Sequence, residues 1–307
     1  MTAGGGGDGK GGVGSRGLLA PEFLKRLEVL DFAARKVFSG QMAGSRRSAS
    51  RFARGTLFRE HRPMTPGDDL RYVDWNVYAR LRVAYVKEFE PEEDLEVAVF
   101  LDGSASMSFG EPEKFGYARG LAAALAFVAL RRLEGVRIVP CGAGGAPPRA
   151  FHGAAEVTRA FRHIAALGPS RGGERPIDAL RAVSSGLRAR GLAVLVSDFY
   201  DPEWTGSALA LLRHRRFRIA ALHVVAPQEL SPGLAGRARL RDAETGRSLP
   251  VDARPEVIEA YRSAFTRHIA SVERSCRRHE AGYARLLTNE PFETALVRIV
   301  KSGNLLR

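Results

Sequence analysis

Two apolar stretches of the sequence end in side chains that could bind a metal ion. The first, LEVAVFL, runs into Asp102, and Ser104 and Ser106 follow at alternate positions; the second, LAVLVS, runs into Asp198. Carboxylate and hydroxyl oxygens are ligands that suit a hard cation such as Mg²⁺ or Mn²⁺. In an alternative interpretation, Asp102 caps the turn that follows it and the two serines form only local hydrogen bonds.

These residues can share one ion only if the two stretches are strands that end at the same edge of a sheet. Apolar runs alternate with helices of ten or more residues, which predicts an α/β fold with a mostly parallel sheet wrapped by helices. In such sheets, ligands bind beyond the carboxyl ends of the strands. The expected strands are 83–89, 95–101, 136–141, 192–197 and 218–225, and the expected helices are 114–132, 156–167, 176–190 and 204–214.

Other segments flank this alternation. A helix is expected from Pro21 to the residue before Gly40, while residues 41–80 are polar, rich in arginine and expected to be irregular. A hairpin is expected around Glu244-Thr245-Gly246. The last expected elements are hairpin strands 238–240 and 248–251, helix 255–279, strand 283–287 and helix 291–301. We divide the chain into four parts: a disordered tail at 1–17, an N-terminal helix with its following segment at 18–92, an α/β core at 93–226, and a C-terminal hairpin with helices at 227–307.

Composition excludes several classes of protein. The 307 residues are 45% hydrophobic and 26% charged, which is typical of a globular chain. No apolar stretch is long enough for a transmembrane helix, and two isolated cysteines favour a reducing compartment, so we expect a cytoplasmic protein. The net charge of +13 comes from arginines that are spread along the chain without interleaved aromatic residues. This argues against specific nucleic-acid binding and leaves non-specific attraction at low salt.

The first metal-site segment carries a resemblance to a known fold. DGSAS, residues 102–106, resembles the DxSxS signature of the metal-ion-dependent adhesion site in von Willebrand factor A domains, and SDF, residues 197–199, is similar to that fold's later aspartate segment. Other blocks, GDDLRYVDW, KEFE and DAETG, resemble the domain-of-unknown-function-58 (DUF58) family, over about residues 20–307. The matching positions in the first block are Gly67, Asp68, Arg71, Asp74, Trp75 and Arg80. For Asp74 and Trp75 we expect a structural role, in which a buried tryptophan lies beside a carboxylate that holds an arginine.

The resemblance implies a von Willebrand factor A-like, Rossmann-like domain with family-specific additions at both ends. It also implies that Ser104 and Ser106 are direct ligands of Mg²⁺ or Mn²⁺, while Asp102 and Asp198 hold the ion through water or outer contacts. Relatives are associated with MoxR-type AAA+ ATPases in chaperone-like maturation of other proteins. Many of them carry membrane helices, so this chain resembles the soluble branch.

One position departs from the family pattern. The family usually has Gly-Gly-Thr before the next helix, with the threonine hydroxyl completing the metal site, whereas this chain has Gly172-Gly173-Glu174. Glu174 could act as a third carboxylate ligand and bind the ion more tightly. Alternatively, the guanidinium of Arg175 could lie among the carboxylates and replace the metal.

These observations together predict a non-enzymatic interaction or adaptor protein with a metal site and a MoxR-like AAA+ ATPase as its partner. No general base accompanies the two aspartates in the sequence, which favours an adaptor over an enzyme. The first alternative is a metal-assisted hydrolase that uses Asp102 and Asp198. The second, weaker alternative is a basic protein associated with nucleic acids. Neither a membrane nor a specific nucleic acid is expected as a partner.

Overall fold

A computed structural model describes residues 56–91, 96–132, 135–142, 146–169, 175–184, 186 and 191–301, together with six separate residues between 18 and 27. The chain forms two compact units. The smaller unit is Met42–Asp94, and the larger unit contains Met1–Gln41 and Leu95–Arg307. The expected tail at 1–17 and most of the helix expected after Pro21 lie outside the described residues, although Glu22, Phe23, Lys25 and Leu27 are helical.

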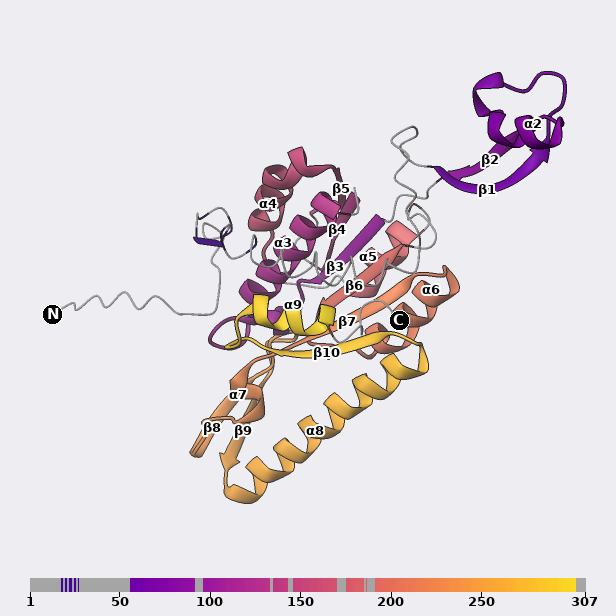
Figure 1. The fold of residues 1–307 in the computed structure, drawn as a ribbon. Coiled ribbons are helices and arrows are strands. Elements are labelled where there is room, and N and C mark those ends of the chain that lie inside the picture. The colour runs from indigo at the N-terminus through magenta and orange to yellow at the C-terminus, as the bar shows by residue number, and fades with distance from the viewer. Residues whose placement is uncertain are drawn as a thin grey trace. The chain divides into compact units, whose positions relative to one another are not determined.

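A six-stranded sheet forms the centre of the larger unit (Figure 1), with strand order β10-β7-β6-β3-β4-β5. The strands are β3 (Glu96–Asp102), β4 (Gly135–Cys141), β5 (Arg149–His152), β6 (Leu192–Ser197), β7 (Arg218–Val225) and β10 (Gly282–Leu287). All neighbours pair in parallel except β5, which pairs antiparallel with β4 at one edge. The chain starts in the middle, builds one half and returns to build the other, as in doubly wound Rossmann-like sheets. The predicted α/β class with a mostly parallel sheet is confirmed.

Helices cover both faces of this sheet. α3, α4 and α9 pack on one face, and α5, α6 and α8 pack on the other. The helices of the larger unit are α3 (Lys114–Arg132), α4 (Val157–Ala166), α5 (Pro176–Ser184), the π-helical turn Trp204–Ala208 that continues into α6 (Leu209–His214), α7 (Pro227–Leu230), α8 (Pro255–Arg278) and α9 (Phe292–Lys301). Two short 3-10 turns, η4 (Ala105–Ser108) and η5 (Ala154–Glu156), precede α3 and α4. None of the described helices is long and apolar enough to span a membrane.

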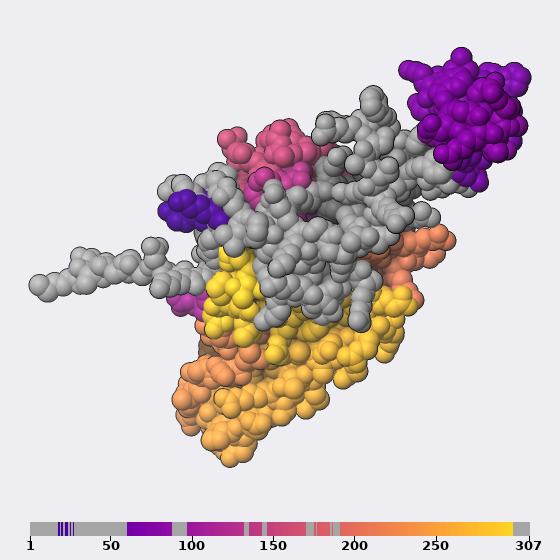
Figure 2. All heavy atoms as spheres, viewed as in Figure 1, coloured from indigo at the N-terminus to yellow at the C-terminus, as the bar shows by residue number. Residues whose placement is uncertain are grey.

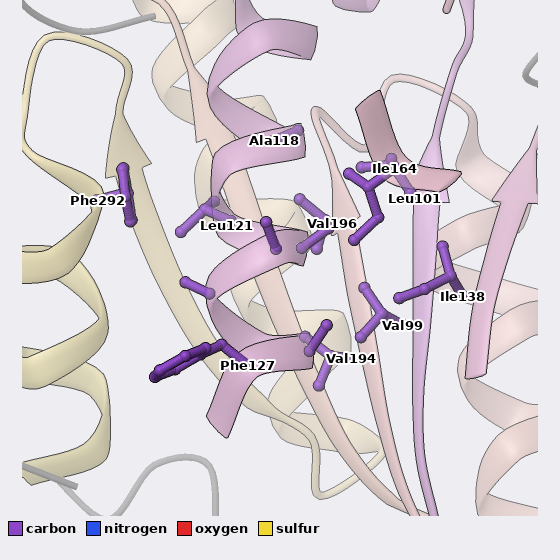
Figure 3. Close-up of a cluster of buried hydrophobic side chains, with 14 of the residues drawn as sticks. Val99, Leu101, Ala118, Leu121, Phe127, Ile138, Ile164, Val194, Val196 and Phe292 are labelled. Carbon is purple, nitrogen blue, oxygen red and sulfur yellow. The ribbon is translucent and has the colours of Figure 1, made fainter. Parts of the chain in front are cut away.

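The two-sided cover explains why the central strands are continuously apolar. In β3, Val97, Val99 and Leu101 point into the cluster beneath α3, whereas Ala98 and Phe100 point into the opposite cluster. A strand buried on both faces needs apolar residues at successive positions rather than at alternate ones. Figure 3 shows the first of these clusters, with side chains of α3 lying against those of β3 and β6. The two clusters fix the register of β3 and β6, and therefore the position of the residues that follow these strands.

The smaller unit contains a hairpin with a short helical connection. β1 (Thr56–Pro63) pairs antiparallel with β2 (Tyr85–Pro91), and η3 (Leu70–Tyr72) and α2 (Trp75–Leu81) lie between them. The expectation of an irregular segment at 41–80 is therefore wrong over its described part. The polar sequence of β1 lacks the alternation of a half-buried strand, because a two-stranded ribbon has no large core to face.

The remaining described elements include a second hairpin, β8 (Gly236–Arg241) and β9 (Ser248–Ala253), which confirms the expected one. Strand β5 was not predicted, because its four residues are mostly exposed and too few to show a pattern. β3, β4, β7, α3 and α8 agree with the predicted elements to within a residue or two at each end.

Candidate functional site

The carboxyl ends of β3 and β6 form the candidate site. These strands are parallel neighbours, with Leu101 paired to Val196, so the two acidic residues that terminate them, Asp102 and Asp198, lie at the same end of the sheet. The chain reverses its direction of growth across the sheet between these two strands. Ligands of doubly wound proteins bind at this kind of switch point. We call this end of the sheet, with the serine loop 103–108, the acidic edge.

Asp102 is buried and held by three hydrogen bonds. Its Oδ1 accepts from the amide of Ser104 at 2.9 Å, and its Oδ2 accepts from the hydroxyl of Ser197 and from Nε1 of Trp204, the latter at 3.2 Å. Burial, and next the negative charge of Asp198, raise the pKa of Asp102 to about 6. These bonds fill about three of the four acceptor positions of a carboxylate. The local capping by Asp102 that the alternative interpretation expected therefore exists.

Asp198 is buried beside a positive charge that the sequence did not indicate. Nζ of Lys114, at the start of α3, lies 2.8 Å from Oδ2 of Asp198 and 2.6 Å from Oε1 of Glu229, which belongs to α7. The Lys114 side chain is fully buried, and its ammonium also lies 5.0 Å from the centre of the Tyr200 ring. The Tyr200 hydroxyl donates to the same Glu229 oxygen at 2.9 Å. A lysine at a helix start normally reaches solvent, so only the three-dimensional contacts reveal this role.

The backbone after Asp198 adopts a conformation that is rare for a bulky residue. Phe199 has φ of 56°, in the left-handed region, and its side chain is buried. The amide of Phe199 donates to the Ser197 hydroxyl at 2.8 Å, and that hydroxyl in turn donates to Asp102. Non-glycine residues in this region carry strain of about 1–3 kcal/mol and cluster at functional sites. The strained turn couples the ends of β3 and β6 through one serine.

The serine loop carries the two hydroxyls of the predicted signature. Oγ of Ser104 and Oγ of Ser106 are hydrogen-bonded to each other at 3.1 Å, the local bond that the alternative interpretation expected, and both residues are half-buried. The amide of Ser106 donates to Oε1 of Glu244 at 2.9 Å, and Glu244 belongs to the turn of the β8–β9 hairpin. The carboxylate of Glu244 thus approaches the loop from a segment 138 positions further along the chain.

The structure also locates part of the segment that departs from the family pattern. Glu174 lies outside the described residues, so its expected role as a ligand stays a prediction. The Arg175 guanidinium pairs with Glu203 at 3.1 Å and with Asp178 at 3.5 Å, and its side chain is 54% exposed. The cation that contacts a strand-end aspartate of the acidic edge is therefore Lys114.

The donor atoms of the acidic edge are suited to a hard divalent cation. Adjacent oxygen ligands of an octahedral Mg²⁺ lie about 3.0 Å apart when the metal–oxygen bonds are about 2.1 Å. The 3.1 Å separation of the two serine hydroxyls is close to that spacing. Of the three buried carboxyl groups here, Asp198 and Glu229 contact the ammonium of Lys114, and its one positive charge cannot balance both. Within the described part of the chain, no three acidic, histidine or cysteine side chains alone could hold a metal ion, so the hydroxyls would have to participate.

The residues of the GDDLRYVDW block lie in the smaller unit and serve its own structure. Asp68 receives two hydrogen bonds from Arg62, and these hold the pKa of its carboxyl well below the usual range. Asp74 caps α2 by accepting from the amides of Asn76 and Val77, and it also contacts His61.

Trp75 is 60% exposed, so the expectation that it is buried beside a carboxylate holding an arginine is wrong. Its ring packs edge-on against Tyr78 instead. Arg71 pairs with Asp69, both Arg71 and Arg80 are exposed, and Gly67 has a positive φ of 105° in the preceding turn.

His223 is a core residue. It lies on β7, and its Nδ1 is 2.9 Å from the Tyr283 hydroxyl. Burial, and next the proximity of His268, lower the pKa of His223 to about 3, so it is neutral at physiological pH. His268 on α8 stacks on Tyr200, and its Nε2 lies 3.4 Å from the backbone oxygen of Asp198. At the acidic edge, His268 therefore contacts backbone and ring atoms.

The fold and this site define a class: a doubly wound α/β protein with two aspartates and a serine loop at the switch point of its sheet. Residues 60–272 match the family described as "Protein of unknown function DUF58", and the chain belongs to this family. It is 33% identical over 258 residues to "Uncharacterized protein Rv1480" of Mycobacterium tuberculosis (strain ATCC 25618 / H37Rv), which covers 79% of this chain and 78% of that protein. The same values hold for "Uncharacterized protein Mb1516" of Mycobacterium bovis.

Solved structures offer more distant similarities. The crystal structure of conserved hypothetical protein BatB from Bacteroides thetaiotaomicron covers 68% of this chain and 98% of its own, with a TM-score of 0.41 and 13% sequence identity. An aerotolerance-related membrane protein from Bacteroides fragilis also covers 68% of this chain and 99% of its own, with a TM-score of 0.39 and 17% identity.

Proposed function

We propose that this protein is a non-enzymatic adaptor whose acidic edge binds Mg²⁺ or Mn²⁺ and contacts other proteins. Ser104 and Ser106 would hold the ion directly, and Asp102 and Asp198 would hold it through water. The observation that carries this proposal is the convergence of two parallel strand ends on a pair of hydroxyls at ligand spacing. When bound, the ion would supply positive charge to attract a carboxylate of a partner.

The contacts of the acidic edge favour binding over hydrolysis. Asp198 is engaged by Lys114, and Asp102 is engaged by Ser197 and Trp204, so neither carboxylate is positioned as an unencumbered general base. A metal-assisted hydrolase needs a base or a metal-bound nucleophile in an open position. The hydrolase remains the alternative to be tested against the adaptor.

The partner that we propose is a MoxR-like AAA+ ATPase, with which the protein would act in chaperone-like maturation of a client protein. This part of the proposal is supported by the resemblance of its GDDLRYVDW block, which implies association with such ATPases. The protein itself would have no ATPase activity. We further propose that it acts in the cytoplasm.

Metal binding is tested by thermal unfolding with and without Mn²⁺. A ligand at 100 times its dissociation constant stabilises the folded state by about 2.7 kcal/mol, which corresponds to a rise of several degrees in melting temperature. The double variant Ser104→Ala with Ser106→Ala should abolish this rise. Ser108→Ala is a matched control, because Ser108 lies in the same loop and is exposed. An equal rise in the double variant would place the ion elsewhere.

The position that departs from the family pattern is tested with the same titration. If Glu174 is a ligand, Glu174→Thr should weaken Mn²⁺ binding because one negative charge is removed from the site. Arg175→Ala should leave Mn²⁺ binding unchanged, because the exposed Arg175 side chain pairs with Glu203 and Asp178. Mn²⁺ binding by Arg175→Ala but not by the wild type would instead show that Arg175 closes the site.

Partner and activity are tested separately on the purified full-length protein. It should not hydrolyse ATP, or phosphate and carboxylate esters, above background in the presence of Mn²⁺. An affinity-tagged copy should recover a AAA+ ATPase from native cells, and the Ser104→Ala, Ser106→Ala double variant should recover less of it. Ester hydrolysis that the double variant loses would favour the hydrolase.

A further inference from the structure

Glu244 is the only described acidic side chain that reaches the serine loop from a hairpin. Its carboxylate accepts a hydrogen bond from the amide of Ser106 at 2.9 Å, across 138 positions of sequence. Ser106 carries both this amide and one of the two hydroxyls of the candidate metal site, so the Glu244 carboxylate lies beside that hydroxyl. The loop thus already receives a carboxylate, which is the group that the proposed function expects from a partner.

The hairpin turn is built to present Glu244. Oδ1 of Asp242 accepts from the amides of Glu244 at 3.0 Å and Thr245 at 2.6 Å, and these bonds, the Thr245 bond first, lower the pKa of Asp242. Gly246 follows with φ of 69°, a left-handed conformation that glycine adopts without strain. The Asp242 amide donates to the backbone oxygen of Arg247 at 2.8 Å and closes the turn. The position of Glu244 is therefore fixed before it meets the loop.

The rest of the hairpin is weakly attached to the sheet. Every residue of β8 is exposed except half-buried Ala238, and in β9 only Val251 and Ala253 are half-buried or buried. The hairpin lies on the molecular surface between α7 and α8 (Figures 1 and 2). A segment with few buried apolar residues can separate from the body of a protein at low cost. The bond between Glu244 and Ser106 is consequently a large part of what holds the turn on the loop.

We propose that Glu244 is a built-in competitor for the acidic edge, so that an acidic side chain of a protein partner must displace the hairpin turn to bind. This inference rests on the proposed function, because it takes the serine loop to be the contact surface. A hydrogen bond from an amide to a carboxylate limits the open fraction to about a tenth to a hundredth of the molecules. The affinity for the partner is reduced by the same factor.

The first test measures hydrogen exchange of residues 103–108 in the full-length protein by mass spectrometry, in EDTA. Glu244→Ala should accelerate exchange at this loop about tenfold or more, because the Ser106 amide loses its acceptor. Asp252→Ala is the matched control: it removes an exposed carboxylate from the same hairpin that pairs with Arg254, and it should leave the loop unchanged. Unchanged exchange in Glu244→Ala would overturn the proposal.

The second test measures competition with a defined probe, a cyclised peptide of residues 236–253 labelled with a fluorophore. Full-length Glu244→Ala should bind the peptide at least about tenfold more tightly than the wild type or Asp252→Ala. A peptide that carries Glu244→Gln should bind more weakly to the same protein. Equal affinity for wild type and Glu244→Ala, or no binding to either, would overturn the proposal.

These outcomes are distinguishable from failure of the metal site. Exchange and peptide binding are both measured in EDTA and again with Mn²⁺. If Mn²⁺ has no effect on melting or on peptide affinity, the metal site fails, whereas the difference between wild type and Glu244→Ala in EDTA still decides whether Glu244 competes.

Discussion

Lys114 places a positive charge inside the acidic edge, where two strand ends and a short helix meet. Its ammonium contacts Asp198 and Glu229 and has no exposed surface. A buried ammonium is stable only when it is paired and hydrogen-bonded, and here two carboxylates and the face of the Tyr200 ring surround it. The lysine fixes α3 and α7 against the end of β6. It also compensates one negative charge of the edge permanently, whatever else binds there.

Removing this lysine should destabilise the protein strongly. In Lys114→Met, Asp198 and Glu229 would remain buried without their cation. Removing one partner of a buried ion pair lowers the free energy of unfolding by about 3–5 kcal/mol. Urea denaturation followed by circular dichroism measures the loss. Arg175→Met is the control, because its ion pairs are exposed and should contribute less than about 1 kcal/mol. Equal losses in the two variants would show that Lys114 is not the structural cation of the edge.

His223 should make the stability of the fold depend on pH. Its pKa is about 3 in the folded protein against 6.5 in a model peptide, so the unfolded chain binds the proton more readily. The stabilisation that neutral His223 gives to the folded state is complete above pH 6.5. It is lost as pH falls toward 3, and the free energy of unfolding then decreases by up to about 1.4 kcal/mol per pH unit. His268, Lys114 and Arg285 disfavour the charged form by repulsion, while Asp198 favours it.

The measurement compares unfolding free energies of wild type and His223→Gln from pH 7.5 to 5. The difference between them should shrink as pH falls, because only the wild type loses this contribution. His214→Gln, at an exposed position of α6, should keep the wild-type dependence. A constant difference between wild type and His223→Gln would show that His223 does not titrate this way.

At the scale of secondary structure elements, the sequence predicted the positions of those elements whose burial requires a recognisable pattern of apolar residues. β3 and β6 are buried on both faces and are continuous apolar runs, and α3 is buried nearly all round and is rich in alanine and leucine. The parallel order followed from the alternation of these runs, and with it the meeting of Asp102 and Asp198 at one edge. The signature serines were found because they follow a strand directly.

The contacts that complete the acidic edge could not be predicted in this way. Lys114, Glu229 and Glu244 reach it from three separate elements, and their contacts span 84 to 138 positions of sequence. No local pattern distinguishes them from solvated charges. For Glu229 a weak signal existed, because the carboxyl end of the central strand β7 lies only a few positions earlier and must lie at the same end of the sheet. β1 was missed because its sequence lacks alternation, and β5 was missed because its four residues are too few to show a pattern.

Helix α3 packs on β3 and β6 and so helps to position the acidic edge. Leu121 is fully buried between α3 and the sheet, and Figure 3 shows it among the side chains of this cluster. Leu121→Ala should cost about 2–5 kcal/mol through lost contacts and a cavity. Leu125→Ala, on the half-buried side of the same helix, should cost less. Chemical denaturation of both variants tests this, and equal losses would contradict the position of α3.

At the scale of the whole molecule, the net charge of +13 raises the question of nucleic-acid binding. Many of the arginines are already engaged by carboxylates of their own surroundings, such as Arg62 with Asp68 and Arg213 with Glu280. Local pairing reduces the positive potential that a phosphate backbone would meet. A dispersed and partly compensated charge is expected to attract nucleic acid only through weak, sequence-independent contacts.

This expectation can be tested by titrating the protein with two labelled DNA duplexes of unrelated sequence. Both should bind equally at 50 mM salt, and their affinity should fall about 10²-fold by 200 mM, as for three or four phosphate contacts. The Ser104→Ala, Ser106→Ala double variant should bind like the wild type, since the acidic edge repels phosphate. A preference for one sequence that persists at 200 mM salt would require base contacts, which non-specific attraction cannot supply. Such a preference would favour the nucleic-acid interpretation over the adaptor, because an adaptor for acidic protein side chains has no need to distinguish base pairs.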